Sequence, residues 1–110
     1  MGQLYEVVSG QILLSRRQEF FRLHREFLLP AMEQIGIVPC HLLLTEVGEY
    51  GRFLDIYAYA DFADYEHKTE QLLRAEGMEE YYQEIGQCIQ GSITVSLMRD
   101  LPYAKAFIEQ

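Results

Sequence analysis

The chain has 110 residues and a formal net charge of −8, from 17 acidic and 9 basic side chains. A chain of this length forms one hydrophobic core, so we expect a single domain over residues 1–110 that needs no disulfide or metal to hold it. Lys and Arg drive binding to phosphate backbones and anionic lipids. The negative charge therefore argues against nucleic-acid and membrane-binding roles.

Targeting and redox signals point to one compartment. Residues 1–5 have no basic stretch followed by an apolar one, so we expect no signal peptide. The apolar stretch at residues 37–44 is far shorter than the roughly 20 residues of a membrane-spanning helix. Cys40 and Cys88 lack CxxC spacing and are typical of reduced, buried thiols. We therefore expect a cytoplasmic protein.

A strand is predicted over residues 4–9, followed by a helix that begins near Ser15, where Ser15 and Gln18 have the spacing of a capping box. Apolar residues then recur at the spacings of three and four that mark the buried face of a helix: Phe20, Leu23, Phe27, Ala31 and Ile35, with Phe21, Leu28 and Met32 widening this stripe. Pro30 has no N–H to donate within this helix. We therefore expect a kink or a break near Leu29.

Two strands joined by a turn are predicted over residues 41–59. One alternating set of side chains, the apolar set, consists of Cys40, Leu42, Leu44, Leu54, Ile56 and Ala58. The other, the mixed set, combines aromatic and titratable groups: His41, Leu43, Thr45, Phe53, Asp55, Tyr57 and Tyr59. The mixed set is too aromatic for a solvated surface and too polar for a plain core, so we interpret it as the wall of a cavity or a subunit interface.

The second half of the chain begins with a helix that Asp61 is expected to cap. Gly77 ends or bends that helix, and a short helical piece over residues 78–85 follows. Residues 92–98 alternate in polarity and predict a strand. Apolar residues in the tail, residues 103–110, suggest that the tail docks onto a surface of the protein.

The order strand, helix, strand, strand, helix, strand predicts an α+β fold of the ferredoxin-like βαββαβ type, with a four-stranded antiparallel sheet. In this fold two helices cover one face of the sheet and leave the other bare. We expect the helices to cover the apolar set, so that the mixed set lies on the bare face. Such a face is best hidden against a second copy, and we expect a homodimer that forms a closed dimeric α+β barrel.

Several short segments between about residues 4 and 73 occur in a recognisable order and spacing: Tyr5-Glu6, Leu29-Pro30, Gly36, Thr45-Glu46-Val47-Gly48 and Ala58-Tyr59. Through them the chain resembles the NIPSNAP family within the dimeric α+β barrel superfamily. The family commonly has a basic residue where this chain has Val8, and often a histidine where it has Asp55. The resemblance implies a barrel dimer of unsettled activity. Superfamily relatives include cofactor-free oxygenases, isomerases and haem-degrading enzymes, all of which use the barrel interior.

The candidate catalytic residues are His41, Asp55 and Tyr57. If the hairpin pairs symmetrically about Glu49, His41 lies opposite Tyr57 and diagonal to Asp55. Asp55 would then fix one imidazole nitrogen and leave the other as a general base, while Tyr57 would orient a phenolic or carbonyl substrate. A one-residue shift of register would place His41 among the side chains that pack against the helices. Alternatively, the three groups satisfy one another at a dimer interface without a substrate.

Further residues are expected to line the barrel interior and bind the ligand: Glu6, Phe53, Tyr59, Thr94, Ser96 and Met98. Glu6 either abstracts a proton or pairs with Arg52 or Arg99 near the barrel mouth. His24 and His67 lie on different helices without the spacing of a metal site, so we expect no metal and no cofactor.

Two functions follow from these residues. In the first, the protein binds a small apolar or aromatic molecule inside the barrel and acts as a cofactor-free oxygenase or isomerase. In the second, the barrel is only a dimer core of a non-catalytic protein-interaction module, with partners bound outside, at the acidic second helix. A real cavity of a few hundred Å³ would favour the first.

Overall fold

The computed structural model describes residues 3–108. One antiparallel sheet in the order β2-β3-β1-β4 is formed by β1 (Leu4–Gln11), β2 (Val38–Leu44), β3 (Arg52–Tyr59) and β4 (Thr94–Arg99). The helical segments are a 3₁₀ turn (Leu14–Arg16), α1 (Arg17–Leu23), a π turn (His24–Leu28), α2 (Leu29–Ile35), α3 (Phe62–Leu73), α4 (Met78–Gly86) and α5 (Lys105–Ile108). The predicted ferredoxin-like α+β fold is confirmed.

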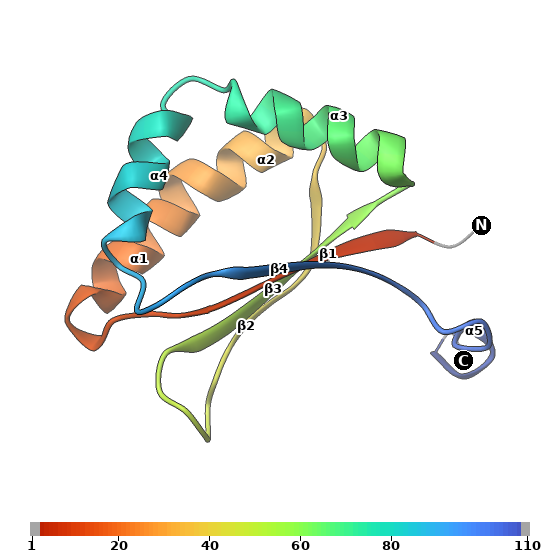
Figure 1. The fold of residues 1–110 in the computed structure, drawn as a ribbon, viewed down its shortest axis with the longest axis horizontal. Helices are drawn as coiled ribbons and strands as arrows, with labels where there is room; N and C mark the ends of the chain where they lie inside the picture. The colour runs from red at the N-terminus through yellow and green to blue at the C-terminus, as the bar shows by residue number, and fades with distance from the viewer. Residues whose placement is uncertain (1–2, 109–110) are drawn as a thin grey trace.

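Helices α1 to α4 lie on one face of the sheet, and the opposite face is open (Figure 1). Residues that pair directly across antiparallel strands share a face. The helix face carries Glu6, Val8, Phe53, Asp55, Tyr57 and Tyr59, whereas the open face carries Val7, Leu54, Ile56, Thr94, Ser96 and Met98. The predicted assignment of faces was therefore wrong for β3, whose mixed residues are buried under the helices and whose aliphatic residues lie on the open face. On β2 it holds, because Leu42 and Leu44 pair with Asp55 and Phe53 on the helix face.

The hairpin register explains why His41 separates from its expected partners. The loop 46–51 has an even number of residues and closes on Thr45 and Arg52, where the backbone N–H of Thr45 donates a 2.9 Å hydrogen bond to the carbonyl of Arg52. Pairing is therefore centred between Gly48 and Glu49, and His41 pairs with Ile56 on the open face. A bulge between Pro39 and His41 shifts the register again. Cys40 lies in this bulge and is exposed, so the predicted burial of both thiols was wrong for Cys40 and holds for Cys88.

The first long helix continues where a break was expected. In the π turn the N–H of Leu29 donates to the carbonyl of His24, five residues earlier, so one extra residue is accommodated just before Pro30. The buried positions after this turn are Leu28 and Met32, and Phe27 is exposed. The predicted stripe was therefore wrong at Phe27, whereas Leu28 and Met32, predicted to widen it, are buried. Ala31 and Ile35 are partly buried against the core.

Helix ends are set by local chemistry. The side chain of Asp61 accepts a 2.8 Å hydrogen bond from the N–H of Asp64, which confirms the predicted cap of α3. Gly36 ends α2 with φ 95°, a conformation that glycine adopts without a steric penalty. Ser15 lies in the 3₁₀ turn, and neither that turn nor α1 has a side-chain cap, so the predicted capping box is not formed.

The hydrophobic core lies between the helix face of the sheet and the helices. Its buried members are Leu4, Ile12, Phe20, Leu23, Leu28, Met32, Ile37, Phe53, Tyr57, Tyr59, Leu72, Met78, Tyr81, Ile85 and Cys88. The tail is different: α5 lies beyond the sheet, apart from the other helices (Figure 1), and Phe107 and Ile108 are exposed. The single chain therefore does not show the predicted docking of the tail, and residues 109–110 of that tail lie outside the described residues. Over residues 3–108, no helix has the length and apolar character needed to cross a membrane.

Candidate functional site

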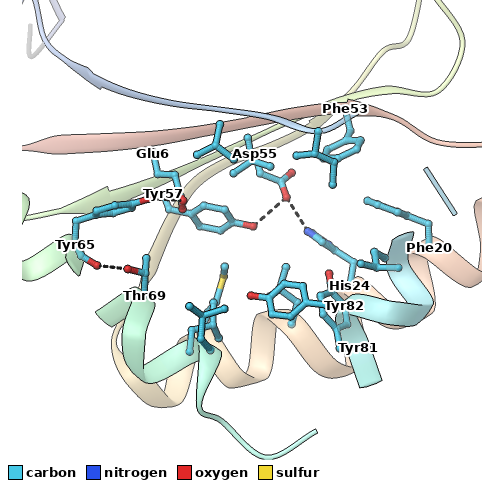
Figure 2. A pocket seen from close by; sticks show the side chains of 18 residues that line it. Glu6, Phe20, His24, Phe53, Asp55, Tyr57, Tyr65, Thr69, Tyr81 and Tyr82 are labelled. Carbon is cyan, nitrogen blue, oxygen red and sulfur yellow. Dashed lines mark hydrogen bonds and ion pairs between the residues drawn. The ribbon is translucent and has the colours of Figure 1, made fainter. Parts of the chain in front are cut away.

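A cavity of about 310 Å³ lies between the helix face of the sheet and the helices (Figure 2). Its walls are mostly apolar and aromatic, and they come from three strands and from the helical segments on both sides of the π turn and in α3 and α4. The lining residues are Glu6, Val8, Phe20, His24, Leu28, Met32, Phe53, Asp55, Tyr57, Tyr65, Thr69, Leu72, Leu73, Tyr81, Tyr82, Ile85, Ile93 and Val95. The size and lining suit a small organic molecule.

Asp55 forms the centre of a hydrogen-bonded chain on the wall of this cavity. Its Oδ2 lies 2.9 Å from Nε2 of His24 and accepts a 2.9 Å hydrogen bond from the hydroxyl of Tyr57 (Figure 2). Only 5% of Asp55 is exposed, so these two partners compensate for the loss of water around its carboxylate. Burial, followed by the nearby charge of Asp55, raises the pKa of Tyr57 well above its ordinary value, which keeps this hydroxyl protonated as a donor.

The end of α1 places His24 opposite Asp55. The imidazole stacks on the ring of Phe20, one helical turn earlier, with ring centroids 5.5 Å apart and an interplanar angle of 15°. Asp55 engages Nε2, and within residues 3–108 the other ring nitrogen, Nδ1, has no hydrogen-bond partner. An imidazole held by a carboxylate on one nitrogen can accept a proton on the other.

Glu6 is the second carboxylate of the cavity. Its two oxygens accept hydrogen bonds from the hydroxyls of Tyr59, at 3.3 Å, and Tyr65, at 3.1 Å. Burial raises the pKa of Glu6 above its ordinary value of 4.5, and the donors Tyr65 and Tyr59 oppose this rise. The predicted pairing with Arg52 or Arg99 is not formed: Arg52 pairs with Glu49, and the guanidinium of Arg99 lies over the ring of Phe62.

Two tyrosines of α4 complete the wall. The hydroxyl of Tyr81 has no hydrogen-bond partner within residues 3–108, although the side chain is buried and lines the cavity. Burial raises the pKa of Tyr81, and it also raises the pKa of Tyr82. Burial and the charge of Glu6 raise the pKa of Tyr65 to about 12. These phenols remain protonated at neutral pH. The hydroxyl of Tyr65 already donates to Glu6, and those of Tyr81 and Tyr82 are available as donors to a ligand.

The structure brings together only part of the predicted site. Of the predicted residues, Glu6, Phe53, Asp55 and Tyr57 line the cavity, and Tyr59 reaches it through its hydrogen bond to Glu6. The others lie on the open face of the sheet: His41, Thr94, Ser96 and Met98. The predicted constellation of His41 with Asp55 and Tyr57 is therefore wrong in its geometry, because the hairpin register turns His41 to the opposite face.

His24 takes the place that the sequence analysis gave to His41. A signal for this was present, since Phe20, His24 and Leu28 recur at a spacing of four and mark one side of a helix. On β4 the cavity is lined by Val95 in place of the predicted Thr94 and Ser96, because neighbouring residues of a strand point to opposite faces. Among residues 3–108, no three His, Cys, Asp or Glu side chains are grouped to hold a metal ion.

Comparisons with known proteins agree with this fold. The family model named NIPSNAP matches residues 5–105. A NIPSNAP family protein from Agrobacterium tumefaciens is similar with a TM-score of 0.82 and 16% identity, covering 93% of this chain and 89% of that one. An uncharacterised NIPSNAP domain protein from Burkholderia xenovorans gives 0.79 and 14%, covering 91% and 96%. An antibiotic biosynthesis monooxygenase gives 0.68 and 19%, covering 90% and 99%. No curated protein matches this chain.

Proposed function

Since this chain belongs to the NIPSNAP family, whose fold it shares with a monooxygenase, we propose that it binds a small, largely apolar molecule and removes a proton from it. The binding site is the cavity between the sheet and the helices, on the side of the sheet opposite to the barrel interior favoured by the sequence analysis. The observation that carries the proposal is an acid–base pair, buried Asp55 and partly buried His24, on the wall of a mostly apolar cavity.

The proposed reaction is an isomerisation that needs no cofactor. The imidazole of His24 accepts a proton from a carbon next to a carbonyl group, and Asp55 stabilises the imidazolium that forms. The electron pair left on carbon moves to the carbonyl oxygen, where the unpartnered hydroxyl of Tyr81 donates a hydrogen bond to the developing charge. In a β,γ-unsaturated carbonyl substrate this charge is shared with the neighbouring C=C bond, so the imidazolium of His24 returns the proton to the γ-carbon. The double bond moves into conjugation with the carbonyl group, and no oxidant is consumed.

A cofactor-free oxygenase is the second candidate, and the likeness to the antibiotic biosynthesis monooxygenase supports it. Its first step would be the same removal of a proton by His24. The resulting carbanion would then react with dioxygen, which would be consumed in proportion to substrate. Oxygen uptake by the sample therefore separates the two reactions.

The experiment uses phenylacetone, an aromatic ketone with an acidic C–H next to its carbonyl. We expect the wild-type protein to speed the exchange of this hydrogen for solvent deuterium, followed by NMR. His24→Gln should lower the rate of exchange about a hundredfold, since a positioned general base contributes at least that much. His67→Gln, on the exposed surface of α3, is the matched control and should keep the wild-type rate.

Two outcomes would contradict the proposal. If phenylacetone binds but its hydrogen does not exchange faster, the protein binds small molecules and does not catalyse proton removal. No binding of small aromatic molecules in ligand-observed NMR would remove the function itself, and the non-catalytic interaction module would then be the better description.

We also propose that the protein is a homodimer in which the open faces of two sheets meet. The open face carries aliphatic side chains on adjacent strands, including Val7, Leu43 and Ile56. An apolar surface of this kind is favourable only when it is covered, and a second copy provides a matching surface by symmetry. The cavity then remains separate in each subunit, because it lies on the other side of the sheet.

A further inference from the structure

The charged groups around the cavity are almost all negative. Glu6 and Asp55 are 9% and 5% exposed, and both side chains line the cavity. Among the lining residues, which all lie within residues 3–108, there is no lysine or arginine. His24 is the one lining group that can become positive, and it is committed to Asp55. A buried negative charge without a cation favours a positive ligand and opposes a negative one.

Glu6 is the carboxylate that has no basic partner. Asp55 is bound by an imidazole, whereas the two hydrogen bonds to Glu6 come from the neutral hydroxyls of Tyr59 and Tyr65. These two donors bind different oxygens of Glu6, and each carboxylate oxygen can accept a second hydrogen bond. The carboxylate of Glu6 therefore has capacity for another donor from inside the cavity.

The aromatic walls also favour a positively charged ligand. Rings from both sides of the cavity line it: Phe20, Phe53, Tyr57, Tyr65, Tyr81 and Tyr82. The face of an aromatic ring carries partial negative charge and attracts ammonium groups, most strongly where water is excluded. The negative charge of Glu6 also contributes to the raised pKa of Tyr57 and Tyr82 at opposite walls, so its field extends across the cavity.

We infer that the cavity selects a ligand that carries a protonated amine, bound by Glu6, and rejects carboxylates and phosphates. This inference rests on the proposed function and narrows its substrate class: the amine lies at Glu6 while the reacting carbon lies at His24. Glu6 is thus a specificity-determining residue, distinct from the acid–base pair.

The test compares three compounds of similar shape with different charge: 2-phenylethylamine, 2-phenylethanol and phenylacetate. Dissociation constants are measured by ligand-observed NMR on the wild-type protein at neutral pH. We expect the amine to bind about tenfold or more tightly than the alcohol, as charged hydrogen bonds exceed neutral ones. Phenylacetate should bind more weakly than either. Measurements at raised salt remove the general attraction of cations to a protein of net charge −8.

Substitution of Glu6 tests whether this residue causes the preference for the amine. Glu6→Gln keeps the shape of the side chain and removes its charge, so the affinity of the amine should fall to that of the alcohol. Glu66→Gln removes the same charge from the exposed surface of α3 and should leave all three affinities unchanged. Should Glu6→Gln fail to fold, the three affinities of the wild-type protein still decide whether the cavity prefers the amine.

The outcomes separate the two claims. Equal affinity of the three compounds, or tighter binding of phenylacetate, overturns the amine preference and leaves the binding function intact. An amine preference that persists in folded Glu6→Gln also overturns the assignment to Glu6. Absence of binding by all three compounds counts against the proposed function, and the inference falls with it.

Discussion

Asp55 illustrates how neighbours from distant segments decide what a residue does. A lone carboxylate at the centre of a core would cost several kcal/mol in lost hydration. Here the cost is offset by one donor on the same strand, Tyr57, and one from the first long helix, His24. The same two bonds fix the orientation of the imidazole, so the groups that make burial tolerable also arrange the site.

Removing the hydroxyl of Tyr57 tests this arrangement at the scale of one atom. Tyr57→Phe leaves the ring in the core and takes one donor from Asp55. We expect the free energy of unfolding, measured with urea, to fall by about 1–3 kcal/mol, the usual effect of losing a hydrogen bond to a buried charged group. Tyr50→Phe, at an exposed position in the hairpin loop, should change it by less than about 0.5 kcal/mol. Equal effects of the two substitutions would show that the bond contributes nothing.

At the scale of elements, the π turn decides which side chains of the first long helix face the sheet. It inserts one extra residue between His24 and Leu28, directly ahead of Pro30. Pro30 lacks the N–H that a regular helix would require, and the wider turn accommodates this defect. His24 therefore lies at the point where the helix departs from regularity, as residues at functional sites often do.

Two neighbouring substitutions test the phase of this helix. Leu28 is 9% exposed and Phe27 is 46% exposed. Leu28→Ala should lower the free energy of unfolding by about 2 kcal/mol through lost burial and a larger void. Phe27→Ala should lower it by less than about 1 kcal/mol, because nearly half of Phe27 is already exposed and its ring contacts the guanidinium of Arg22 at the surface. The reverse order, measured by thermal or urea unfolding, would show that the regular helical period holds.

The helices and strands could be predicted from the sequence, but the face of the sheet or helix on which each side chain lies could not. Strand formers, Asp61 at a helix start and Gly36 at a helix end act locally, so their signals lie within a few neighbouring residues. The faces depend on single-residue shifts. An even hairpin loop turned His41 away from Asp55, and at the π turn Phe27 is exposed while Leu28 is buried.

The site was half predictable for the same reason. Asp55 and Tyr57 share a strand, so their common side follows from a period of two, and the structure keeps them together. Their third partner comes from a helix 31 residues earlier in the chain, and no local pattern specifies that contact. The polar side of this strand was interpreted as facing away from the helices. The hydrogen-bond partners of the buried carboxylates, His24 for Asp55 and Tyr65 for Glu6, lie on helical segments elsewhere in the chain.

At the scale of the whole molecule, two apolar surfaces remain uncovered in a single chain. One is the open face of the sheet, with partly exposed aliphatic side chains on three strands. The other is the tail, where Leu101, Tyr103, Phe107 and Ile108 are exposed. Both surfaces lie away from the layer formed by α1 to α4 (Figure 1). A single pairing between copies through the open face would cover the larger of them.

A charge on the open face should separate the proposed dimer. Leu43 is 49% exposed and lies on the open face of β2, so Leu43→Glu would place two like charges in the contact. We expect analytical ultracentrifugation to show a wild-type dimer and a folded Leu43→Glu monomer. Leu14→Glu, in the exposed 3₁₀ turn, should remain a dimer. A wild-type protein that sediments as a monomer at micromolar concentration would refute the pairing.

The aromatic lining of the cavity has an optical consequence. The chain contains eight tyrosines and no tryptophan, and four of those tyrosines line the cavity: Tyr57, Tyr65, Tyr81 and Tyr82. In most proteins tryptophan emission masks that of tyrosine, but here half of the intrinsic fluorophores surround the ligand site itself. A molecule that enters the cavity displaces solvent beside them and quenches or shifts their emission, so the native chain reports its own occupancy without a label.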